Sequence, residues 1–178
     1  MRIKSFNQTI DRWIKELKEY DFKQLCAKPS SNSWSMGQVG MHLIENTNYF
    51  IEQIKICMAT DDNANEEASP EAKQMFQNND FPNEILEGPP SNLKTPQPQS
   101  KEALLSGLKN LKNEIDSVAV LISASQFKGK TKHPGLNYFN ASEWFQFSEM
   151  HFRHHLRQKK RIDEFLKMNK NQFREKEL

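Results

Sequence analysis

Four segments of the chain repeat apolar residues at spacings of three and four, and this periodicity limits the possible folds more than any other feature. They cover Ile3–Tyr20, Ser35–Cys57, about Ser100–Ile122 and Asn140–Phe165. Such spacing places apolar side chains on one face of an α-helix and charged side chains on the others. No segment shows strand alternation bounded by hairpin turns. The pattern therefore predicts an all-α protein built as a four-helix bundle.

The segment from about 60 to 99 differs from the rest, because it is polar and holds most of the prolines. Ser69–Pro70–Glu71 can start one brief helix, with Ser as the N-cap and Pro in the first turn. A connection of about 40 residues is long enough to run the length of a helix. We therefore expect the second and third helices to be parallel, in up-down-down-up order.

The same segment carries hydrophobic side chains that are expected to anchor it to the bundle: Phe76, Phe81, Ile85 and Leu86. Long loops on a rigid scaffold often carry function. One hypothesis is that this crossover covers part of a binding site and influences substrate choice. A plain connector is the alternative.

Composition narrows the class of protein. The net charge is +2 over 178 residues, and the one basic cluster, at 157–161, is followed by Asp163 and Glu164. This pattern indicates a solvated helix face and no nucleic-acid partner. Two cysteines, no signal-peptide core and no run of about 18 apolar residues favour a cytoplasmic protein without a membrane partner. Residues 1–168 are predicted to form a single domain, with 169–178 a solvated C-terminal tail.

Histidines gather in the stretch "MHFRHHLRQ" at 150–158. His151 and His155 are four residues apart and share the inward face of the predicted helix, while His154 lies on the flank. Geometry alone allows His151 to bind a metal together with either His154 or His155. The alternative is that these histidines are partly buried and form hydrogen bonds with carbonyls or water. His42 lies on the second helix beside Asn46. Three neutral imidazoles from two helices could hold Zn²⁺, Ni²⁺ or Fe²⁺ and leave positions open.

Two stretches, "SWSMGQVGMHLIE" at 33–45 and "KHPGLNYFNASEWFQFSEMHFRHHLRQ" at 132–158, resemble the DinB-like superfamily of damage-inducible, metal-dependent hydrolase-like four-helix-bundle proteins. The resemblance implies a divalent metal bound by His42, His151 and His155. It gives His154 no ligand role, makes His133 a structural element of the loop before the last helix, and implies a homodimer. Lys159 departs from the family pattern, which has an apolar residue there.

The resemblance does not single out one reaction, since the superfamily includes thiol S-transferases, thiol-dependent isomerases and hydrolases. We expect a metal-dependent S-transferase in which the ion activates a low-molecular-weight thiol to attack a small electrophile. A metal-dependent hydrolase, or a non-catalytic stress-response protein that binds metal or a small ligand, is the alternative. Glu45 and Glu149 are the nearest carboxylates in sequence. A surface position is expected for both, and a supporting role beside the metal ligands is the alternative.

Overall fold

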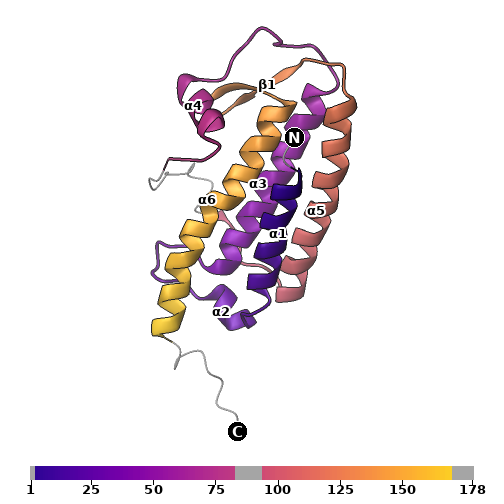
Figure 1. Cartoon of the computed structure of the whole chain (residues 1–178). Helices are drawn as coiled ribbons and strands as arrows, with labels where there is room; N and C mark the ends of the chain where they lie inside the picture. The colour runs from indigo at the N-terminus through magenta and orange to yellow at the C-terminus, as the bar shows by residue number, and fades with distance from the viewer. Residues whose placement is uncertain (1–2, 83–93, 170–178) are drawn as a thin grey trace.

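The computed structural model describes residues 3–82 and 94–169, and four long helices pack side by side to form its body (Figure 1). These helices are α1 (Ile3–Leu17), α3 (Met36–Cys57), α5 (Lys101–Ala124) and α6 (Ala141–Met168). The predicted four-helix bundle is therefore confirmed. Among the described residues, no helix combines the length and the apolar character needed to cross a membrane.

Side-chain contacts fix the directions of the helices. Asn7 donates to Asp116 and Lys112 donates to Asp11, so α1 and α5 are antiparallel. Gly40 of α3 faces Leu104 of α5, because a Cβ added at Gly40 would lie 2.9 Å from the Leu104 side chain. Gly107 of α5 faces Ile44 of α3 in the same way, at 2.8 Å. Residue numbers thus rise together along α3 and α5, which are parallel. The expected up-down-down-up order is confirmed.

Capping boxes mark the starts of α3 and α6. Ser35 Oγ accepts from the Gln38 backbone N–H at 3.1 Å, and the Gln38 side chain accepts from the Ser35 N–H at 3.2 Å. Asn140 and Glu143 form the same reciprocal pair at the start of α6. Each such cap contributes on the order of 1 kcal/mol by satisfying backbone donors in the first turn. These caps fix the starts of the two helices that carry histidines.

Two short elements were not expected from the sequence. Helix α2 (Phe22–Cys26) follows α1, and an antiparallel hairpin of β1 (Lys130–His133) and β2 (Asn137–Asn140) joins α5 to α6. The expectation of no strands is therefore wrong at this connection. Four-residue strands are too short to show a periodic signal. Burial of Phe139 against Trp144, with ring centroids 5.0 Å apart, holds the hairpin against the bundle.

The crossover between α3 and α5 contains the predicted brief helix, α4 (Pro70–Asn78), with Ser69 as its N-cap. Phe81 is buried and Phe76 packs against the core, as expected of anchors. The other two expected anchors, Ile85 and Leu86, lie outside the described residues. Near its end the crossover returns to the start of α3, where Gln38 donates to the Thr95 carbonyl at 2.6 Å.

The core lies between the four long helices and is rich in aromatic side chains. Trp13 of α1 donates its ring N–H to the Phe152 carbonyl of α6 at 3.2 Å, and Phe6 packs against the Phe145 and Phe152 rings at 5.5 Å. These contacts set the rotation of α6. One face of α6 therefore turns toward α1 and another toward α3, where its histidines lie. The expected tail, 169–178, falls almost wholly outside the described residues, so its boundary stays a prediction.

Candidate metal centre

Two helices bring together the three histidines that the sequence indicated. His42 lies in the second turn of α3, and His151 and His155 lie on successive turns of α6. The Nε2 atom of His151 is 3.1 Å from Nε2 of His42 and 3.1 Å from Nε2 of His155. One nitrogen from each ring lies within 4.8 Å of the others. The inward face predicted for the i, i+4 pair is confirmed, because His155 is buried and His151 is half-buried.

The spacing of these nitrogens fits a shared cation. Metal–nitrogen bonds of about 2.0–2.1 Å place two imidazole nitrogens on one ion about 2.9 Å apart at a right angle and about 3.4 Å apart at a tetrahedral angle. The two observed distances of 3.1 Å fall inside this range. Imidazole nitrogen suits zinc, nickel and iron. The donor set is thus chemically suited to a divalent transition metal.

Burial keeps the three imidazoles neutral. It lowers the pKa of His42 to about 4, with a further contribution from nearby His154, and lowers the pKa of His155 to about 3. The pKa of His151 lies well below its usual value, first because of burial and then because of His155 and His42. Only a neutral imidazole offers a lone pair to a metal. At pH 7 all three rings can therefore act as ligands.

Polar neighbours orient two of the rings. Nδ1 of His155 lies 2.8 Å from Oε1 of Gln158, so Nδ1–H can donate to Gln158 and leave Nε2 free. The side-chain nitrogen of Asn46, Nδ2, lies 2.7 Å from Nδ1 and 3.1 Å from Nε2 of His42. Such outer partners commonly hold metal-binding histidines in one tautomer and orientation. Gln158 is the last residue of the stretch 132–158 that carries the family resemblance. Nδ1 of His151 is buried and has no hydrogen-bond partner among the described residues.

Aromatic side chains surround the cluster. Trp34, just before α3, lies 4.7 Å from His42 and 6.3 Å from His155 between ring centroids. Phe50 of α3 approaches His151 at 5.7 Å, and Phe81 of the crossover approaches it at 6.4 Å. Trp34 belongs to the stretch 33–45 that carries the family resemblance. Its position over two imidazoles depends on the loop conformation, which sequence periodicity does not predict.

The remaining histidines lie outside the cluster. His154 is next to His155 but stacks edge-on against Phe81 at 5.3 Å, and it is not a member of the three-histidine group. His133 of β1 packs against Phe139 and Phe147 at 5.0 and 4.9 Å. Its place among aromatic rings agrees with the structural role expected for it.

The two candidate carboxylates have different positions. Glu45 is exposed, as expected. Glu149 is only 2% exposed, so its expected place at the surface is wrong. Arg153 binds it with Nε at 2.8 Å, and Ser5 of α1 donates to it at 3.3 Å. Glu149 therefore faces α1, and no hydrogen bond between the described residues joins it to the histidines.

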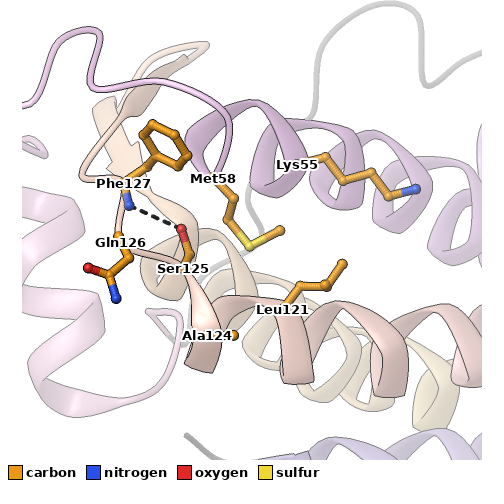
Figure 2. Close-up of a pocket in the computed structure, with 7 residues that line it drawn as sticks. All are labelled: Lys55, Met58, Leu121, Ala124, Ser125, Gln126 and Phe127. Atoms are coloured by element: carbon orange, nitrogen blue, oxygen red, sulfur yellow. Dashed lines mark hydrogen bonds between the residues drawn. The ribbon is translucent and has the colours of Figure 1, made fainter.

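A shallow groove of about 470 Å³ lies elsewhere, where α3 and α5 end (Figure 2). Its lining is mostly apolar and includes Met58, Leu121 and Phe127. Thirteen residues of α3 separate His42 from Lys55 at its edge, a rise of about 20 Å. The groove is therefore separate from the histidine cluster. Cys57 is buried nearby as a free thiol against the Phe139 carbonyl, while Cys26 is half-buried.

Fold and site together define a helical-bundle protein with a cluster of three histidines between two helices. The family model of the DinB superfamily matches residues 5–158, and the chain belongs to this metal-binding superfamily. Among solved structures, the chain is similar to "TT2238, a four-helix bundle protein", with a TM-score of 0.57 and 14% identity. The match covers 88% of this chain and 94% of that one. No curated protein matches the chain.

Proposed function

We propose that this protein is a divalent-metal-dependent enzyme that transfers a low-molecular-weight thiol to a small electrophile. His42, His151 and His155 would hold the ion. The convergence of three neutral imidazoles carries the proposal, because no fourth His, Cys, Asp or Glu of the described residues joins the group. Zn²⁺, Ni²⁺ and Fe²⁺ take four or more ligands, so three histidines leave room for a substrate.

Each part of the site has a chemical role in this proposal. A divalent ion bound there would lower the pKa of a thiol and so supply a thiolate nucleophile at neutral pH. Gln158 would hold the His155 ring through Nδ1, and Asn46 lies against the His42 ring. Trp34 and Phe50 limit the access of water to the rings. The thiol sulfur bonds to the electrophilic carbon, the leaving group departs with its electron pair, and the thiol proton passes to solvent.

The positions of the carboxylates favour thiol transfer over hydrolysis. Hydrolases at metal sites often use a nearby acid or base to move protons. Glu149 is held by Arg153 and Ser5, and Glu45 is exposed, so neither supports this role. A thiol needs less help, since its usual pKa of about 8.5 is already near neutrality. The homodimer and the cytoplasmic location stay predictions.

Metal analysis and a conjugation assay test the proposal together. Purified protein is expected to hold about one transition-metal ion per chain, measured by plasma mass spectrometry. Conjugation of 1-chloro-2,4-dinitrobenzene with a panel of thiols should require the protein, stop with chelator and return with metal. His42→Ala is the inactive control. Full activity without metal contradicts the proposal. Metal-dependent ester cleavage without a thiol indicates a hydrolase, and bound metal without turnover indicates a non-catalytic binding protein.

A further inference from the structure

The residues that follow α4 are fastened to α6 beside the histidine cluster. Arg153 donates to the Asn79 carbonyl at 2.6 Å. Arg157, one turn further along α6, donates to the Asp80 carboxylate at 2.7 Å and to the Pro82 carbonyl at 3.1 Å. Arg157 also donates to the Phe81 carbonyl at 3.5 Å, so two arginines of one helix contact all four residues of the segment 79–82. Charge-assisted bonds of this kind are stronger than neutral ones and fix geometry.

The backbone turns sharply within this segment. Asn79 ends α4 with a φ of 53°, which is in the left-handed region. Asparagine adopts this conformation more readily than most residues. Gln146 of α6 donates to its side-chain oxygen at 3.0 Å. The Asp80 carboxylate then accepts from the Phe81 backbone N–H at 2.9 Å. These bonds direct the Phe81 ring toward α6.

Phe81 consequently has a fixed place at the edge of the site. It is 7% exposed, and its ring lies 5.0 Å from Phe147, 5.3 Å from His154 and 6.4 Å from His151 between centroids. His42 and His155 are covered by Trp34 and are 6% and 7% exposed, whereas His151 keeps more exposure. Phe81 therefore lies against the His151 side of the cluster.

We propose that Phe81 is a specificity-determining residue that limits the size of the thiol admitted beside His151. This inference rests on the proposed function, because it assumes that a thiol binds at the histidine cluster. A buried aromatic ring held by its neighbours does not swing aside without cost. Truncation to alanine would leave an apolar cavity at the edge of the site. A thiol with a bulky apolar group could fill this cavity, while a small polar thiol would gain nothing.

Cobalt-substituted protein allows a test that needs no turnover. Co²⁺ is loaded in place of the native metal, and its visible absorption bands report when a thiol enters the site. The dissociation constants of 2-mercaptoethanol and phenylmethanethiol are measured for each variant. Phe81→Ala should shift the ratio of the two constants toward phenylmethanethiol by about tenfold, the scale of hydrophobic-pocket discrimination. Phe81→Leu should shift it less, by about threefold.

Phe76→Ala is the matched control. Phe76 lies on α4 in the same crossover but packs against Phe139 at 5.0 Å, so the ratio should stay at the wild-type value. If Phe81→Ala does not fold or hold Co²⁺, Phe81→Leu decides the question. An unchanged ratio in the Phe81 variants overturns this inference and leaves the metal site standing. A wild-type protein whose Co²⁺ bands do not respond to either thiol overturns the proposed function, and the inference with it.

Discussion

Nε2 of His42 lies 3.1 Å from Nε2 of His151, although 109 residues separate the two histidines along the chain. The pair meets because α3 and α6 pack antiparallel. Phe50 of α3 stacks on Trp144 of α6 with ring centroids 5.4 Å apart, and it also contacts His151. Large aromatic side chains thus fix the register of one helix against the other. The distance between the candidate ligands is therefore a property of the core packing.

Removal of a single ligand is expected to abolish most metal binding. His42→Ala and His155→Ala each take away one of three nitrogens in the cluster, so both variants should lose most of the metal after dialysis. His154→Ala is the matched control and should keep it, because His154 packs on Phe81 outside the group. Metal analysis of the three proteins gives the readout. Stoichiometric metal in His42→Ala would shift the assignment to the histidines of α6 alone.

Loss of the outer partner of His155 should weaken metal affinity without removing a ligand. In Gln158→Ala the His155 Nδ1–H loses its acceptor at 2.8 Å, and the ring is free to rotate or change tautomer. Outer-partner mutations of this kind typically cost about 10–100-fold in affinity. Competition with a chromophoric chelator measures the change. Circular dichroism should show unchanged helicity, and an affinity equal to the wild type would leave Gln158 without a part in the site.

Local signals in the sequence predicted much of the fold and of the site. Ser35 with Gln38 marks the start of α3, and Asn140 with Glu143 marks the start of α6, because a capping box involves residues only three apart. The shared face of His151 and His155 follows from helix geometry in the same way. The pairing with His42 was suggested by its place beside Asn46 on a second helix and was specified by the family resemblance, since no local rule brings residues of two helices together.

The features that the sequence did not predict depend on distant partners. Glu149 is buried because Ser5, 144 residues away, and Arg153 satisfy its carboxylate. The hairpin is held by Phe139 in the aromatic core, and its strands are too short for a periodic pattern. The family resemblance led us to expect an apolar residue at position 159, where this chain has Lys159. In the structure its amine is fully engaged with α1 and with its own helix.

Acid should destabilise the metal-free protein through its buried histidines. Burial lowers the pKa of His133 to about 4, as it does for His42. The unfolded chain, with histidine pKa values of about 6.5, binds more protons than the folded one below that pH. The free energy of unfolding is therefore highest above pH 6.5. It should fall by up to about 1.4 kcal/mol per pH unit for each such histidine as the pH drops toward 4.

Urea unfolding in the presence of chelator, at several pH values between about 7 and 5, measures this slope. His133→Phe keeps an aromatic ring against Phe139 and Phe147 but removes the titrating group. Its slope should be shallower than that of the wild type by up to about 1.4 kcal/mol per pH unit. Equal slopes in the two proteins would show that His133 titrates normally in the folded state.

Lys159 is expected to stabilise the junction of α1 and α6. It is 5% exposed, and its Nζ lies 2.7 Å from Glu16, 2.7 Å from Asp163 and 2.9 Å from the Tyr20 hydroxyl. Burial alone would lower the pKa of Lys159, but the hydrogen bonds to these three groups outweigh it and raise the pKa. Removing one partner of a buried ion pair costs about 3–5 kcal/mol, because the opposite charges stay behind.

Lys159→Met should therefore reduce the free energy of unfolding by about 2–3 kcal/mol. This loss is smaller than that for a fully buried ion pair, because Glu16 and Asp163 are partly exposed and can be hydrated. Lys160→Met, at the exposed neighbouring position, is the matched control and should change the free energy of unfolding by less than about 0.5 kcal/mol. Urea unfolding measures both variants, and metal content should match the wild type in each. A Lys159→Met protein as stable as the control would mean that methionine packing fully replaces the ion pairs.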